Sequence, residues 1–313
     1  FERSAGGEAR PAERIAAAGV DAGPTGRDDR GGSEGPDFGS SAVLGSSDSE
    51  SGSAVTFRPV TQDDLAPSGA RARFQANVAA IALSRLIEDE VRPATPEEQR
   101  VLARWSSWGA VPQVFDDAND QWAEEREHLR SLLDADTYTA ARRTIINAHY
   151  TDAGYVSAMW DTLQDLGFEG GAVLEPGAGS GTFIGMAPAS ARMVGVELDP
   201  TTASIARGLY PEAEIRTESF AESRFPRVHF DATIGNVPFA DTRLYDPQFN
   251  ANNHSMHNHF IVKSLAMTRP GGMAVVLTSA FTMAATTPAA RREMNSMADL
   301  VGAVRLPSGA HRR

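Results

Sequence analysis

The stretch VLEPGAGSGTF, from Val173 to Phe183, joins an apolar run to three closely spaced glycines. An apolar run that ends in a glycine-rich turn is typical of the first strand and loop of a doubly wound α/β fold, because the missing side chains let a ligand lie against bare backbone. The loop therefore predicts a site for a nucleotide or a nucleoside-like cofactor. No lysine follows the glycines, so a phosphate-cradling P-loop is excluded and ATP is not the expected ligand.

An acidic residue follows the loop at the distance that such a fold requires. In VGVELD, Glu197 stands twenty residues after Gly177, at the end of a second apolar run. A carboxylate at the tip of the second strand can accept hydrogen bonds from both hydroxyls of a ribose. Proteins that bind NAD and proteins that bind S-adenosylmethionine share both features, so the glycine loop and the acid do not decide which of the two cofactors binds.

The sequence after Tyr150 alternates short β-rich runs with helical stretches, which is typical of a parallel sheet covered on both faces. Strands are predicted at 172–174, 193–196, 213–216, 231–234, 273–278 and 300–306, and helices at 154–166, 202–209, 257–267 and 288–297. This pattern predicts a Rossmann-like, doubly wound and mostly parallel sheet.

The segment DATIGNVPF, residues 231–239, distinguishes between the cofactors. It places an amide, a proline and an aromatic side chain after the fourth predicted strand, at the sheet edge where ligands bind. Adenine's amino nitrogen is a poor nucleophile because its lone pair is delocalised into the ring, and two acceptors on its hydrogens would localise that lone pair. Asn236 can offer its side-chain oxygen and Val237 its carbonyl, while Pro238 stiffens the turn and Phe239 can stack on a flipped base. Taken alone, the four residues could be a strand-ending turn, but their place after the loop and the acidic tip favours a catalytic role.

The motif Asn236-Val237-Pro238-Phe239 resembles the Asn-Pro-Pro-Tyr/Phe motif of the γ-type amino-methyltransferases. A closer resemblance is to the methylase region of large methylase-helicase fusion proteins of phages, plasmids and integrative elements. The resemblance to this region is carried by NAHYTDAGYVSAMW, VLEPGAGSGTFIG, GVELDPTTASIARGLYP, IGNVPFADTRLYDP, RPGGMAVVLTS and LVGAVRLPSGA. The stretches RPATPEEQRVLARW and WGAVPQVFD resemble the segment that precedes it in those proteins, so the similarity runs from about Arg73 to the end of the chain.

This resemblance implies a class I methyltransferase fold, S-adenosylmethionine as cofactor, adenine N6 in DNA as the methyl acceptor, and a helicase region after Arg313. It implies that His149, Tyr150 and Thr151 contact the methionine end of the cofactor and that Ser219 and Phe220 lie beside its adenine. Two residues depart from the pattern: Val237 replaces the first proline, and Ser219 stands where many relatives carry an aspartate. The predicted catalytic set is Asn236, Val237, Pro238 and Phe239, and the predicted cofactor-binding set is Tyr150, Thr151, Glu175, Pro176, Gly177, Gly179, Gly181, Phe183, Glu197, Leu198, Ser219 and Phe220.

The composition limits the size of the core, the possible disulfide and zinc chemistry, and the binding partners. The 313 residues, 41% of them hydrophobic, suffice for one large core, and the absence of cysteine excludes disulfides and thiolate zinc sites. No membrane span or signal peptide is visible, so we expect a cytoplasmic protein. The net charge of -12 argues against tight nonspecific binding of phosphate. We predict a disordered tail at 1–55, a helical lead-in at 56–147 and the catalytic domain at 148–313, its sheet incomplete without a final hairpin. The lead-in could clamp the substrate, but packing on the catalytic domain is the favoured role.

Three polar groups outside the motif have weaker claims. His254, His257 and His259 resemble a metal cluster, but helix entry or loop packing is favoured and no metal site is predicted. Arg243 and Tyr245 lie on a loop that could meet the DNA backbone, although such loops are more often simply solvated. Asp231 opens a strand, and a structural role is preferred for it.

Two other functions stay open. A glutamine side chain presents the same two amide hydrogens, so protein glutamine N-methylation is an alternative. A cofactor-binding module that positions a helicase without catalysis is the other, because of Val237 and the missing final strand.

Overall fold

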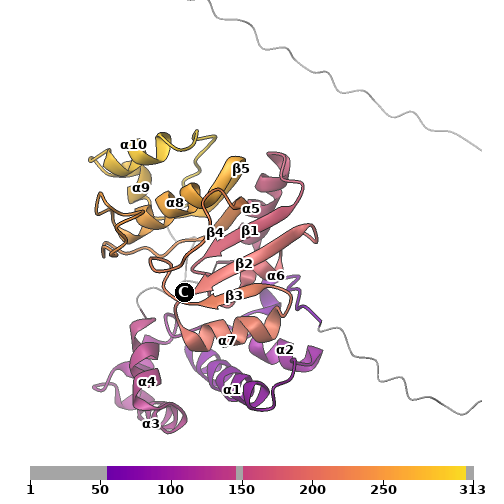
Figure 1. Cartoon of the computed structure of the whole chain (residues 1–313). Coiled ribbons are helices and arrows are strands. Elements are labelled where there is room, and N and C mark those ends of the chain that lie inside the picture. Colours follow the sequence, from indigo (N-terminus) through magenta and orange to yellow (C-terminus); the bar gives the residue numbers. More distant parts are fainter. Residues whose placement is uncertain (1–54, 146–150, 308–313) are drawn as a thin grey trace, which may run out of the picture. The chain divides into compact units, whose positions relative to one another are not determined.

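The computed structural model describes residues 55–145 and 151–307. The five strands of its sheet are β1 (Gly171–Pro176), β2 (Ala191–Glu197), β3 (Glu214–Thr217), β4 (Phe230–Asn236) and β5 (Thr268–Leu277). They lie in the order β3-β2-β1-β4-β5, which the arrows of Figure 1 follow, and every pairing is parallel. This is a Rossmann-like doubly wound arrangement, so the fold class predicted from sequence is confirmed.

Strand register brings three loops to one edge of the sheet. Pro176, the last residue of β1, pairs with Val196 of β2, and Asn236, the last residue of β4, pairs with Leu277 of β5. Because β1 also pairs with β4, the chain leaves β1, β2 and β4 at the same carboxyl edge. The glycine loop, the acidic tip and the Asn236 motif therefore share that edge.

Consecutive strand residues point into two different cores. Val173 of β1 joins the core that includes α5 (Ala153–Asp165), α6 (Thr182–Gly185) and α7 (Pro200–Leu209). Leu174 joins the other core, which includes α8 (Met256–Met267). Since side chains alternate along a strand, a run buried on both faces must be largely apolar, as VL is. The hydroxyl of buried Thr233 in β4 lies 3.1 Å from that of Thr268, which satisfies this buried polar group.

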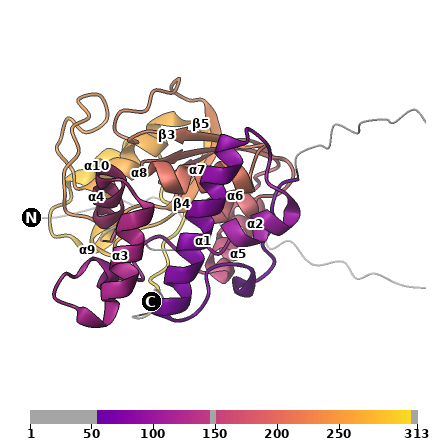
Figure 2. The same cartoon turned by 90° about the horizontal axis from the view of Figure 1, so that it is seen from below.

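The lead-in consists of α1 (Ala70–Asp89), α2 (Pro96–Leu102), α3 (Ala123–Leu132) and α4 (Ala135–Arg143), with single 3-10 turns at Gln62–Asp64, Pro112–Phe115 and Asp120–Trp122. Figure 2 shows α1 beside α2 and α7, and the same elements are in contact. Helix α2 begins at a capping box, in which the side chain of Thr95 accepts from the N–H of Glu98 and the Glu98 carboxylate accepts from the N–H of Thr95. The residues Thr95-Pro96-Glu97-Glu98 thus form a helix start with proline at the first helical position.

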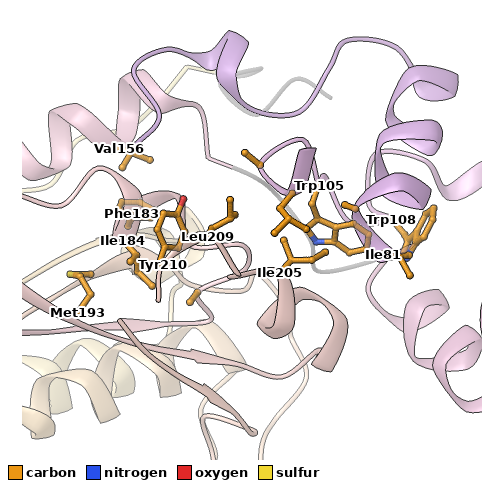
Figure 3. Packing of buried hydrophobic residues seen from close by; sticks show 14 of the residues in the cluster. Ile81, Trp105, Trp108, Val156, Phe183, Ile184, Met193, Ile205, Leu209 and Tyr210 are labelled. Carbon is orange, nitrogen blue, oxygen red and sulfur yellow. The ribbon is translucent and has the colours of Figure 1, made fainter. Parts of the chain in front are cut away.

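Two buried tryptophans join the lead-in to the sheet domain. Trp105 is 1% exposed, and its indole N–H donates to the hydroxyl of Thr202 on α7 over 3.2 Å. Its ring meets that of Trp108 edge to face, with centroids 5.8 Å apart. Figure 3 shows both rings in one cluster with Ile81 and Ile205. The lead-in and the sheet therefore share one hydrophobic core.

Five of the six predicted strands are present, with β5 starting five residues earlier than predicted. The sixth, at 300–306, is wrong: these residues form no strand, and Leu300, Val301 and Val304 are 66%, 76% and 88% exposed. An apolar run becomes a strand only where it finds a paired neighbour, and β5 is paired only with β4 in the described part of the chain. The four helices predicted after Tyr150 are present as α5, α7, α8 and α10 (Ala289–Asn295), and the short α6 and α9 (Phe281–Ala284) were not predicted.

Some predictions fall outside the described residues, namely nearly all of the tail at 1–55 and the residues His149 and Tyr150. Among the helices that are described, none is both long and apolar enough to cross a membrane.

Candidate cofactor and substrate site

The carboxyl edge of the sheet contains a cavity of about 520 Å³. Its wall includes residues from β1, β2 and β4, from the loops that follow them, and from α8 and the lead-in. Of the predicted site residues, those that line it are Thr151, Glu175, Gly177, Gly179, Phe183, Glu197, Leu198, Ser219, Phe220, Asn236, Val237, Pro238 and Phe239. All the predicted catalytic residues and most of the predicted cofactor residues therefore meet in one space.

The glycine loop turns back on β2. Gly177 and Gly179 have φ values of +70° and +57°, in the left-handed region that glycine occupies without a steric penalty. The N–H groups of Gly177 and Ala178 both donate to the carbonyl of Val196, over 2.8 and 2.9 Å. These bonds fix the loop against the neighbouring strand, and Gly177, Ala178 and Gly179 line the cavity.

Glu197 ties the glycine loop to the start of α7. One carboxylate oxygen accepts from the N–H of Gly179 and the other from the N–H of Asp199, each over 2.8 Å. Asp199 in turn caps α7 by accepting from the N–H and hydroxyl of Thr202. Burial raises the pKa of Glu197 above its ordinary value, although the two backbone bonds favour the ionised form.

Glu175 is the most deeply buried acid of the cavity, with 2% of its surface exposed. Within the described residues, its Oε2 atom has no hydrogen-bond partner. Burial, with a further contribution from the nearby charge of Glu197, raises the pKa of Glu175 well above its ordinary value. A buried carboxylate of this kind is stabilised in its charged form by a cation, so the site favours a positively charged ligand group.

The Asn236 motif lies against the glycine loop. The N–H of Val237 donates to the carbonyl of Leu277 over 3.0 Å, which extends the β4–β5 pairing by one residue. Val237 is buried in the core on the α8 side. A Cβ added at Gly177 would lie 3.7 Å from Cδ of Pro238, so the two loops are in van der Waals reach.

Aromatic side chains form another part of the cavity wall. Phe220 is 3% exposed and packs on Phe260 of α8, with ring centroids 4.8 Å apart and planes at 47°. Both rings line the cavity. The carbonyl of Phe220 accepts from the ammonium group of Lys263, which also lies on α8. Phe220, one of the two residues predicted to lie beside the adenine, is thus held by α8.

The structure adds wall residues that the sequence reading missed. Ser107, Ala140, Arg143 and Thr144 come from the lead-in, for which packing on the catalytic domain was the favoured role. Their positions follow from how the lead-in folds onto α7, and no local spacing signals it. Residues from other elements that were also missed are Ala178, Thr182, Val196, Asp199, Pro200, Thr202, Glu218, Leu244, Met256 and Phe260.

Two predicted cofactor residues do not line the cavity. Pro176 is buried as the last residue of β1. Gly181 precedes α6 with a φ of +83°, and a Cβ there would lie 2.7 Å from the ring of Tyr210. Both residues therefore contribute to the conformation of the loop without lining the cavity. The glycine spacing alone could not distinguish Gly181 from the glycines that do line it.

Each of the three histidines that precede or begin α8 contacts another group of the protein. Nε2 of His254 lies 2.6 Å from Glu293, and Nε2 of His259 lies 3.0 Å from Asp246. Nδ1 of His257 lies 3.3 Å from the carbonyl of Ala240, and burial lowers the pKa of this imidazole. No cluster of three potential metal ligands occurs within residues 55–145 and 151–307.

Asp231 lies at the amino end of β4, away from the cavity. Its carboxylate accepts from the N–H of Ala172 over 2.8 Å and from Nε of Arg269 over 2.6 Å. Arg269 holds the pKa of Asp231 below its ordinary value. The residue joins three strands, which is the structural role that the sequence suggested.

The strand order and the cavity at the carboxyl edge define a Rossmann-like doubly wound α/β protein. No family model matches the chain. A segment of 200 residues is 28% identical to the defense against restriction protein B of Escherichia phage P1, and the match covers 58% of this chain and 9% of that protein. The chain thus corresponds to a small part of that relative's length.

The chain is also similar to solved structures. One is the methyltransferase subunit of the type I restriction-modification system from Streptococcus thermophilus, at 14% identity over 71% of this chain and 59% of that chain, with a TM-score of 0.41. Another is a geranyl diphosphate methyltransferase solved in complex with S-adenosylmethionine, at 14% identity over 53% of this chain and 57% of that chain, with a TM-score of 0.32.

Proposed function

We propose that this chain transfers the methyl group of S-adenosylmethionine to N6 of adenine in DNA. The observation that carries the proposal is that Asn236, Val237, Pro238 and Phe239 line the same cavity as the glycine loop and Glu197. One space of about 520 Å³ can hold a nucleoside cofactor and an inserted base together.

The wall residues fit this cofactor. The unpartnered Oε2 of buried Glu175 suits the ammonium group of an amino acid, which would favour the charged carboxylate. Each oxygen of Glu197 accepts one backbone N–H and has a second acceptor direction for a ribose hydroxyl. Phe220 and Leu198 offer apolar surface to an adenine ring. When bound, the cofactor supplies a methyl group on a sulfonium centre that is open to direct displacement.

The motif residues fit an amino group as the acceptor of the methyl group. The side-chain oxygen of Asn236 and the carbonyl of Val237 would accept the two hydrogens of the adenine amino group and direct its lone pair away from the ring. Valine in place of proline keeps that carbonyl. Phe239 would stack on the base after it leaves the duplex. Alignment of the donor and acceptor atoms then supplies most of the catalysis.

The phage P1 relative supports DNA as the substrate, since the name of that protein concerns defence against restriction. We accordingly place the activity in a longer protein of a mobile element, with a helicase region as the expected partner. The two alternatives are methylation of a glutamine side chain and a cofactor-binding module without catalysis.

Product analysis tests the proposal. The chain is incubated with S-adenosylmethionine and either adenine-containing DNA or a cell-free protein mixture, and each is digested for mass spectrometry. We expect N6-methyldeoxyadenosine in the DNA digest. Methylglutamine in the protein digest, with unmodified DNA, would replace the proposal by the first alternative, and cofactor binding without either product would replace it by the second.

A further inference from the structure

Tyr245 is an aromatic residue exposed beside the cavity. Its side chain is 87% exposed, although it directly follows Leu244, which lines the cavity. Leu244 packs on the buried cluster of the α8 face together with Val237 and Phe249. The chain from Leu244 to Asp246 therefore alternates inward, outward and inward, and the one outward side chain carries a ring.

A buried charged cluster anchors the chain directly after Tyr245. The side chain of Asp246 is 1% exposed and lies 3.1 Å from the Lys263 ammonium and 3.0 Å from Nε2 of His259. Both of these partners come from α8 and are fully buried. The Asp246 carboxylate also accepts from the N–H groups of Gln248 and Phe249 over 3.2 Å. The backbone at this point is fixed to the helix below it.

A second set of bonds anchors the chain directly before Tyr245. The amide group of Asn250 donates to the carbonyl of Leu244 over 2.9 Å and accepts from the N–H of His254 over 2.7 Å. Nε of Arg243 donates to the carbonyl of Asn253 over 3.1 Å. With both flanks held, the loop at 241–253 is preformed, so a ligand that uses Tyr245 need not pay for ordering it.

Exposed arginine in the same loop as Tyr245 favours an anionic partner. The Arg243 side chain is half exposed, and the Arg227 guanidinium lies 5.4 Å from the ring centre of Phe249 in the same loop. Asp241 lies 3.9 Å from Arg243 but is almost fully exposed, so solvent weakens its attraction. Arg243 and Tyr245 are both exposed and lie two residues apart on this loop. An arginine and an accessible ring on one loop are the groups with which proteins hold nucleic acid, through phosphate contact and base stacking.

We propose that the loop at 241–253 is a preformed nucleic-acid contact, in which the Tyr245 ring stacks on a base next to the target and Arg243 meets a phosphate. This inference rests on the proposed function for its substrate class. It assigns a separate role to a residue outside the motif, namely holding the strand while one base enters the cavity.

Fluorescence anisotropy tests the assignment without requiring catalysis. A fluorescein-labelled oligodeoxynucleotide, single-stranded or duplex, is titrated with the chain at several salt concentrations. We expect Tyr245→Ala to weaken binding about tenfold at every salt concentration, because stacking is lost, and Tyr245→Phe to restore it. Arg243→Ala should weaken binding and lower the slope of log affinity against log salt by about 1.

Arg100→Ala is the matched charge control, because Arg100 is exposed on α2 and pairs only with Glu97 among the ion pairs of the described residues. It should leave affinity and slope unchanged. Equal affinities for the wild type and Tyr245→Ala would overturn the inference, as would a wild type that binds only a protein partner and no DNA. Tyr245-dependent DNA binding without methyl transfer would uphold it and overturn the proposed function alone.

Discussion

Replacing Lys263 by methionine removes an ammonium group from a fully buried position. In the wild type this group donates to the carbonyls of Phe220, Ala221 and Ser223 and to the carboxylate of Asp246. These bonds connect Phe220, in the aromatic wall of the cavity, to Asp246, which anchors the loop at 241–253. Both the folded state and the geometry of the site are therefore expected to depend on this residue.

The size of the effect follows from burial. Loss of one partner of a buried ion pair costs about 3–5 kcal/mol, because the other charge is left uncompensated. We expect Lys263→Met and Asp246→Asn each to lower the free energy of unfolding by that amount. In the double variant neither charge remains, so its loss should be smaller than the sum of the two by more than about 1 kcal/mol.

Urea unfolding measures these values, with the emission of the chain's four tryptophans as the signal. Arg100→Met is the control, since its partner Glu97 and Arg100 itself are exposed and such a surface pair contributes less than about 1 kcal/mol. If either buried substitution cost no more than this control, or if the two losses simply added, the cluster would not be a coupled anchor.

Three further substitutions test other parts of the structure. Because burial raises the pKa of Glu175 above its ordinary value of 4.5, the folded chain binds this proton more tightly than the unfolded chain, and the contribution of the carboxyl to stability falls as pH rises from about 4.5 through the raised pKa. Glu175→Gln should therefore raise the Tm of the ligand-free protein at pH 8 but not at pH 4, and it should weaken cofactor binding in calorimetry. The same Tm difference between variant and wild type at both pH values would contradict the raised pKa. Trp105→Ala should cost about 3–5 kcal/mol in urea unfolding, and a loss below about 1 kcal/mol would mean that the lead-in does not share the core. Gly181→Ala should lower the Tm, because its φ of +83° and the 2.7 Å approach to Tyr210 leave no room for a Cβ, whereas Gly69→Ala, at φ +87° with open space around it, should cost less.

Most of the sheet could be predicted because its signals are local. The run VLEP followed by glycines identifies a buried strand and its turn, and VGVELD repeats the pattern with an acid at the tip. Parallel strands meet at one edge, so the juxtaposition of Gly177, Glu197 and Asn236 follows from the strand assignment alone.

Other features depend on contacts that spacing does not encode. The apolar pattern at 300–306 predicted a strand, but strand formation depends on pairing, and in the described part of the chain these residues do not join the free edge of β5. Arg143 and Thr144 reach the cavity because of the way the lead-in packs on α7. The sole lysine, Lys263, reads as one polar residue in the apolar helix FIVKSLAM, and only the fold shows four acceptors around it.

The most direct test compares methyl transfer and cofactor binding in the wild type and Asn236→Ala. Tritiated S-adenosylmethionine is mixed with DNA, label retained on the DNA is counted, and cofactor affinity is measured separately by calorimetry. We predict that the wild type labels DNA, and that Asn236→Ala loses at least about a hundredfold in rate while its cofactor affinity changes less than about threefold, since Asn236 acts on the acceptor base. Equal labelling of DNA by the two proteins would contradict the claim that the Asn236 motif holds the reacting amino group.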